Sequence, residues 1–122
     1  MAITPFADSP RNGAWGDRPY AIIDLAGPSS YTVVTTASPP TGGQAVTPAT
    51  FGLVAGLEGI FMVGASKTGT YGVRAMQATA YNQGQNNGTW IVQWFVLATG
   101  AEVTAATNLS SETVRLIAFG PY

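Results

Sequence analysis

Few side chains in this chain of 122 residues could carry out acid–base, nucleophilic or metal chemistry. The sequence holds no histidine and no cysteine, with only five basic and six acidic residues. Histidine is the usual proton carrier near neutral pH and, together with cysteine, a principal ligand of zinc. Their absence weighs against most enzyme classes, so we expect no enzymatic activity, no metal site and no cofactor.

One segment resembles a phosphate-binding loop at first reading. GASKTG, at residues 64–69, places a lysine and a threonine among glycines. Such a loop needs Gly-Lys-Ser/Thr between a strand and a helix, whereas here Ser66 precedes Lys67 and the residues that follow have the alternation of a strand. We therefore interpret the segment as a turn.

The acidic residues could serve glycoside hydrolysis only if two of them lay about 5 to 10 Å apart. Neither Asp17 with Asp24 nor Glu58 with Glu102 has a spacing that predicts this, and solvated surface charges are the favoured interpretation.

Asp24 is a special case because it interrupts the apolar run AIIDLAG. A carboxylate in an apolar strand either meets a cation or faces solvent. Arg18 and Arg115 are its candidate partners, and a strand-edge position would explain it equally well.

The charge content limits the partners that the protein can have. Charged residues make up 9% of the chain, against about a quarter in an ordinary soluble domain. The basic residues form no stripe that could neutralise phosphates, so we expect no nucleic acid partner. A weakly charged chain that is 46% hydrophobic is either suited to association with other proteins or simply a Thr-rich β domain.

Membrane and export signals are not expected. No apolar run reaches the length of about 18 residues that a spanning helix needs, and the first residues lack the basic and apolar regions of a secretory signal. We expect a soluble protein that begins inside a cell and does not contact a membrane.

The elements that position these residues are predicted to be strands. Apolar or alternating runs bounded by Gly, Pro and Asn indicate strands, and Thr47 followed by Pro48 predicts one helical turn before Gly52. The predicted strands are Tyr20–Leu25, Tyr31–Thr36, Leu57–Val63, Thr70–Ala80, Trp90–Leu97 and Thr113–Phe119. Six to eight strands with almost no helix predict an all-β, mainly antiparallel sandwich, barrel or jelly roll as a single domain over residues 20–122.

The strand Trp90–Leu97 is apolar at nearly every position. Its alternation places Trp90, Val92, Trp94 and Val96 on one face and Ile91, Gln93, Phe95 and Leu97 on the other. We assign the first set to the interior. The second set needs a further cover, which is either the N-terminal segment or another subunit.

Residues 1–19 are predicted to form an extended arm, because three prolines and two glycines occur there without helical or strand periodicity. Phe6 and Trp15 are its candidate anchors, on the same domain or on a neighbouring subunit. With Tyr20 and Phe95 they are the candidate contacts with capsid or subunits.

The first 32 residues, MAITPFADSPRNGAWGDRPYAIIDLAGPSSYT, and the last ten, TVRLIAFGPY, resemble a group of small virion proteins of tailed bacteriophages. Proteins of this group are similar in role to capsid decoration or cement proteins, which are β-rich, often trimeric, and clamp neighbouring capsid subunits from outside. The resemblance implies a homo-oligomer, with a trimer favoured, bound to the major capsid protein on the virion surface after synthesis in the bacterial cytoplasm. A carbohydrate- or receptor-binding module of a tail or fibre, or a head-to-tail or tail component, is the alternative.

Overall fold

The computed structural model describes residues 11–15, 18–35, 40–53, 57–78 and 89–120 of the chain. Within these ranges it contains seven strands and one 3-10 helix. They are β1 (Arg11–Trp15), β2 (Arg18–Ala26), β3 (Gln44–Val46), the 3-10 helix η2 (Pro48–Phe51), β4 (Gly59–Val63), β5 (Tyr71–Gln77), β6 (Trp90–Val96) and β7 (Thr113–Phe119).

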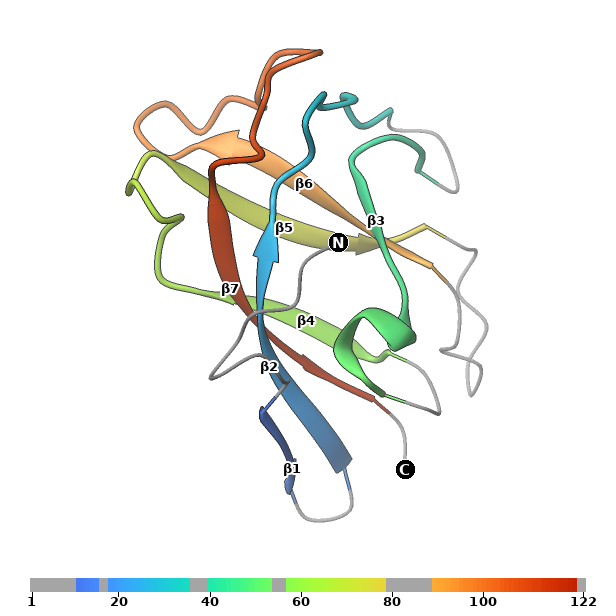
Figure 1. Cartoon of the computed structure of the whole chain (residues 1–122). Coiled ribbons are helices and arrows are strands. Elements are labelled where there is room, and N and C mark those ends of the chain that lie inside the picture. The colour runs from blue at the N-terminus through green and yellow to red at the C-terminus, as the bar shows by residue number, and fades with distance from the viewer. Residues whose placement is uncertain (1–10, 16–17, 36–39, 54–56, 79–88, 121–122) are drawn as a thin grey trace.

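The strands form two antiparallel sheets that pack as a sandwich, which confirms the predicted all-β class (Figure 1). One sheet has four strands in the order β1-β2-β7-β4, and the other has three in the order β3-β6-β5. The central strands β2 and β7 pair along Tyr20↔Phe119 to Ala26↔Thr113, although the first belongs to the start of the domain and the second to its end. This long-range pairing holds the four-stranded sheet together.

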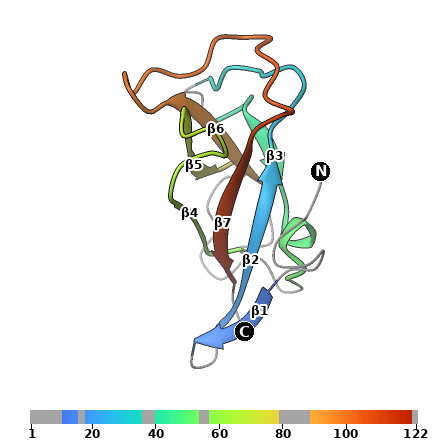
Figure 2. The ribbon, with the colours of Figure 1, turned by 60° about the vertical axis from the view of Figure 1, so that its left-hand side comes forward.

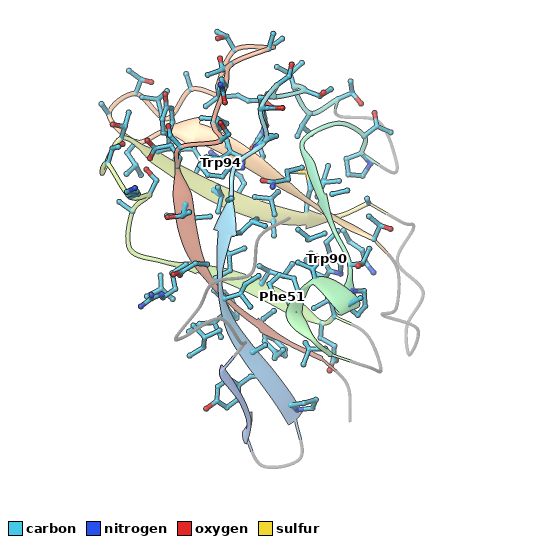
Figure 3. The ribbon with its side chains drawn as sticks, viewed as in Figure 1. Phe51, Trp90 and Trp94 are labelled. Atoms are coloured by element: carbon cyan, nitrogen blue, oxygen red, sulfur yellow. The ribbon has the colours of Figure 1, made fainter. Side chains whose placement is uncertain are left out.

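Alternation along the strands directs one set of side chains between the sheets. β2 contributes Ala21, Ile23 and Leu25, and β7 contributes Val114, Leu116 and Ala118, all of them buried. From the other sheet Val92 and Trp94 are fully buried, with Trp90 and Val96 packed against the same cluster. The predicted interior face of the Trp90–Leu97 segment is therefore confirmed, and Figure 3 shows Trp94 among the side chains of the sandwich.

A polar bridge satisfies the indole of Trp94 inside this core. Its Nε1 donates to Oε1 of Gln44 at 2.9 Å, and Nε2 of Gln44 donates to the carbonyl of Ala26 at 2.7 Å. Because a buried N–H without a partner is costly, Gln44 both pairs the indole and ties β3 to the end of β2.

The predicted helical turn is confirmed as η2. Pro48 stands at its start, the backbone N–H of Thr47 donates to the side chain of Thr50, and the turn ends at Gly52 with φ 71°. η2 places Phe51 in the core beside β3 and Trp90 (Figure 3). β3 is not among the strands predicted from the sequence.

The predicted strand Tyr31–Thr36 is wrong over the residues that the structure describes. Only Thr35 forms a bridge, with Thr41, while Thr36 lies outside the described residues. The backbone N–H and C=O of Tyr31 instead pair with Thr107 and Ala106, in the connection between β6 and β7. This segment is therefore a loop that packs against another loop, although its residues favour strands.

The segment expected to be an arm differs from that expectation where it is described. Arg11–Trp15 forms β1, which pairs with β2 from Arg11↔Ile22 to Trp15↔Arg18, and β2 begins two residues before Tyr20. Figures 1 and 2 show β1 and the adjoining part of β2 projecting beyond the rest of the sandwich. Residues 1–10, including Phe6, lie outside the described residues.

Candidate interaction surfaces

Asp24 forms an ion pair, one of the two arrangements expected for a carboxylate within an apolar strand. Nε and a terminal nitrogen of Arg115 donate to its two carboxylate oxygens at 2.8 and 3.1 Å, and the two residues face each other across β2 and β7. The hydrogen bonds with Asp24 raise the pKa of Arg115, with burial acting in the opposite direction. Of the two candidates, Arg115 is the partner, and both charges on this part of the outer sheet surface are thereby neutralised.

Around this ion pair, the described outward side chains of β2, β7 and β4 are mostly apolar. We call this surface the Phe61 face, and define it by the outward residues of β2, β7 and β4, which are Tyr20, Ile22, Asp24, Arg115, Ile117, Phe119, Phe61 and Val63. Phe61 and Val63 are 55% and 44% exposed. In a domain of this size, adjacent large apolar side chains left open to solvent indicate an interaction surface.

The rings on this face are arranged across strands. The ring of Phe61 stacks on that of Phe119, with centroids 5.7 Å apart and planes at 19°. Gly59 leaves room for this, since a Cβ at its position would lie 2.5 Å from the Phe119 ring. Tyr20 pairs directly with Phe119, so this predicted contact residue lies on the face, half-buried.

An open hollow of about 310 Å³ adjoins the Phe61 face at the start of β7. It is lined by Asp24, Val63, Ala65, Lys67, Thr113 and Arg115. Its carboxylate is already paired with Arg115. No group of three or more potential metal ligands occurs among the described residues. The hollow is thus a continuation of the outer surface, and its polar lining consists of the Asp24–Arg115 pair, Lys67 and Thr113.

The surface of the opposite sheet shows what covers Phe95. The guanidinium of Arg74 lies over its ring, 4.8 Å from the centroid. Gly72, directly across from Phe95, has no side chain, and a Cβ there would meet the Phe95 ring at 2.7 Å and Leu97 at 3.0 Å. Phe95 is half-buried and Leu97 is 41% exposed. We call Arg74, Phe95 and Leu97 the Arg74 patch.

Two of the remaining described carboxylates, Glu102 and Glu112, hold loops in place. Glu102 accepts hydrogen bonds from the hydroxyl of Tyr31 at 2.8 Å and from the backbone of Val34 at 2.7 Å. Glu112, which is buried, accepts from the backbone and hydroxyl of Thr68 at 3.2 and 3.0 Å. Burial alone would raise the pKa of Glu112, but hydrogen bonds from Ser66 and Thr68 and the charge of Lys67 outweigh it and lower the pKa. These contacts are structural.

Two predicted contact residues, Phe6 and Trp15, have no described side chain. Phe6 lies outside the described residues, and Trp15 is placed in β1 without a described side chain. Phe61, Val63 and Arg74 were missed as candidates. The alternation within LEGIFMV was a signal for the first two, because it sets Phe61 and Val63 on the face opposite Ile60 and Met62, which pack on the core.

Comparison with known proteins adds no relative to this description. No family model matches the sequence, and neither a curated protein nor a solved structure similar to it is found. Within the described residues, none of the helical structure has the length and apolar character needed to cross a membrane.

Proposed function

We propose that this protein is a non-enzymatic structural component of a bacteriophage virion, of the capsid decoration or cement kind. In this proposal it forms a homo-oligomer, with a trimer favoured, and reinforces contacts between major capsid subunits at the virion surface. The observation that supports the proposal is the Phe61 face, where exposed apolar side chains surround an ion pair that is complete within the chain.

The charges of the Phe61 face favour burial against another protein. Covering an unpaired charge leaves it without solvation, which costs several kcal/mol. Here Arg115 already pairs with Asp24 through two hydrogen bonds, so a neighbouring subunit could cover the face without supplying a counter-charge. The net charge of −1 adds little repulsion between copies.

The gain from covering the face can be estimated from Phe61 alone. A phenylalanine that is 55% exposed leaves about 100 Å² of surface open to water. At about 25 cal/mol per Å², burying it contributes about 2.5 kcal/mol per subunit. Repetition over the many equivalent positions of a shell would turn this modest contribution into substantial reinforcement.

The carbohydrate-binding alternative loses two of its aromatic candidates. Trp94 is fully buried and Trp90 packs against the core, so neither presents its ring to a sugar. Phe61 and Phe119 are still available to this alternative, but their rings stack on each other within the apolar Phe61 face.

Phe61→Ser tests the proposal, with Val33→Ser as the matched control because Val33 is 38% exposed outside the Phe61 face. We expect wild-type protein to sediment as an oligomer and to co-sediment with capsids that lack it. Phe61→Ser should weaken assembly or capsid binding at least tenfold, while Val33→Ser should not. Sedimentation of the wild type as a monomer that does not bind capsids would overturn the proposal.

A further inference from the structure

The Arg74 patch differs from the Phe61 face in its charge. Arg74 and Phe95 are diagonal neighbours on β5 and β6, since Gly72 pairs with Phe95 and Arg74 pairs with Gln93. Side chains in this relation reach each other when one of them is long. The exposed guanidinium therefore rests on a half-buried ring, 4.8 Å from its centroid, beside the exposed Leu97.

In the part of the chain that the structure describes, Arg74 has no carboxylate partner. The ion pair recorded there joins Arg115 to Asp24. The cation–π contact with Phe95 favours a position of the guanidinium over the ring, but it does not neutralise the charge of this exposed side chain. Arg74 is thus a positive charge that is positioned without being neutralised.

This arrangement restricts what can cover the patch. A partner that buried Phe95 and Leu97 would also remove water from the guanidinium, which is favourable only if acceptor oxygens replace that water. A carboxylate can do so with two parallel hydrogen bonds, while apolar side chains beside it contact Phe95 and Leu97. Arginine and aromatic residues together are the side chains that most often dominate protein interfaces.

We propose that the Arg74 patch binds a protein segment that presents a carboxylate next to apolar side chains, and that this segment belongs to a protein other than this chain. The second part is supported by the other described carboxylates, each of which already has a partner within its own chain. Asp24 pairs with Arg115, Glu102 with Tyr31, and Glu112 with Thr68. Glu58 also has an interaction within the chain. From the described residues, a second copy could supply the counter-charge only by sharing or breaking one of these contacts, while Asp8 and Asp17 lie outside the described residues.

The inference rests on the proposed function only for the identity of the partner, which would be a neighbouring virion protein such as the capsid subunit. The chemistry of the site can be tested without that partner. Suitable probes are the capped tripeptides acetyl-Leu-Glu-Leu-amide and acetyl-Leu-Gln-Leu-amide, which have similar shape and differ in charge.

Titration of labelled protein with each peptide, followed by amide chemical shifts in NMR spectra, is the test. We expect the Glu peptide to shift resonances of residues 72–76 and 95–97 at millimolar concentration, and the Gln peptide to bind at least fivefold more weakly. Arg74→Gln should abolish the difference between the peptides, and Arg74→Lys should retain part of it. Lys67→Gln, which removes an exposed cation on another surface, should leave binding unchanged.

Equal binding of the two peptides by the wild type, or a preference for the Glu peptide that persists in Arg74→Gln, would overturn the inference. The absence of localised shifts at millimolar peptide concentration would overturn it as well. Capsid co-sedimentation separates the two proposals. If the wild type binds the Glu peptide at this patch but neither assembles nor binds capsids, the proposed function fails and the site stands.

Discussion

Tyr31→Phe tests how the edge of β6 is satisfied beyond the point where its pairing with β3 ends. β3 pairs with β6 only as far as Gln44↔Val92. At the next position along the same edge, the backbone N–H of Trp94 donates to the hydroxyl of Tyr31 at 3.1 Å, and its carbonyl accepts from Val103 at 3.0 Å. A side-chain hydroxyl thus replaces the missing strand at one point of the ladder.

The cost of removing this hydroxyl has two parts. The N–H of Trp94 is buried, and leaving it without an acceptor costs about 1 to 3 kcal/mol. Glu102 also loses the donor that lies 2.8 Å from it, but this carboxylate is partly exposed and keeps the N–H of Val34, so water can replace the hydroxyl at a cost of about 0.5 kcal/mol. We expect a total loss of about 2.5 kcal/mol in the free energy of unfolding, equivalent to about 10 °C in Tm.

Urea unfolding followed by tryptophan fluorescence measures the loss, because Trp94 lies beside the substitution. Tyr71→Phe is the matched control. Tyr71 packs edge-on against Trp94, with centroids 6.3 Å apart, and among the described residues no hydrogen bond of its hydroxyl is recorded. A loss below about 0.5 kcal/mol in Tyr31→Phe, or an equal loss in the control, would refute the role assigned to this hydroxyl.

The pH dependence of the same variant provides a second test. Burial first, and then the hydrogen bond to Glu102, raise the pKa of Tyr31 above its ordinary value. A group whose pKa is higher in the folded state stabilises the fold below its unfolded pKa, which is about 10 for tyrosine, and this contribution is lost as pH rises further. The stability difference between wild type and Tyr31→Phe should stay constant from pH 6 to 9 and shrink above about pH 10.

Three further predictions follow from other contacts. A double-mutant cycle on Asp24→Asn and Arg115→Gln should give a coupling of at most about 1 kcal/mol in urea unfolding, reduced in 1 M salt, because the side chains are 22% and 41% exposed. Glu112→Gln should be less stable than wild type at pH 7, because the lowered pKa of Glu112 stabilises the fold above the unfolded pKa of about 4.5. The difference in stability should shrink as pH falls below that value. Unfolding followed by circular dichroism at several pH values measures it, and a difference that stays constant would contradict the prediction. Gly27→Ala should lower the free energy of unfolding by more than about 2 kcal/mol, because its Cβ would lie 2.4 Å from the backbone oxygen of Leu109. Gly64→Ala, in open space at φ 74°, should lower it by about 1 kcal/mol. Thermal unfolding measures both.

The strands that the sequence predicted well are those in which pattern and burial agree. Thr113–Phe119 is confirmed residue by residue, and Trp90–Leu97 ends one residue earlier, at Val96. In β7 burial alternates strictly along the strand, and in β6 it follows the predicted faces except at Ile91, which is buried although it belongs to the outward set. Asp24 belongs with them, because a carboxylate within an apolar strand requires a partner wherever the strand is placed.

Other elements depend on contacts that a local pattern does not contain. β3 has three residues and follows two glycines with positive φ, Gly42 and Gly43, so its composition indicates a turn. Tyr31–Val34 has the composition of a strand, but the backbone of Tyr31 pairs with the connection between β6 and β7, and the carbonyl of Thr32 accepts from Gly43. In both places, tertiary pairing with a distant segment decided the structure against the local preference.

The candidate surfaces were predictable only in part for the same reason. Phe95 was expected to need a cover, and the sequence offered the N-terminal segment or another subunit. In the structure, the guanidinium of Arg74 lies over its ring. That contact depends on the register Arg74↔Gln93 and Gly72↔Phe95, and one residue of slippage would send Arg74 to the other face of the sheet.

The two surfaces imply different partners because their arginines are in different states. On the Phe61 face, Arg115 is neutralised within the chain, so a surface without charge can cover it. On the Arg74 patch the guanidinium is held by a ring, which orients it without compensating its charge. If both surfaces are used at once, a subunit would join an apolar neighbour on one sheet to an acidic neighbour on the other. Raising the salt concentration should then weaken the second contact and strengthen or spare the first, and equal salt dependence of the two would show that the charges do not distinguish them.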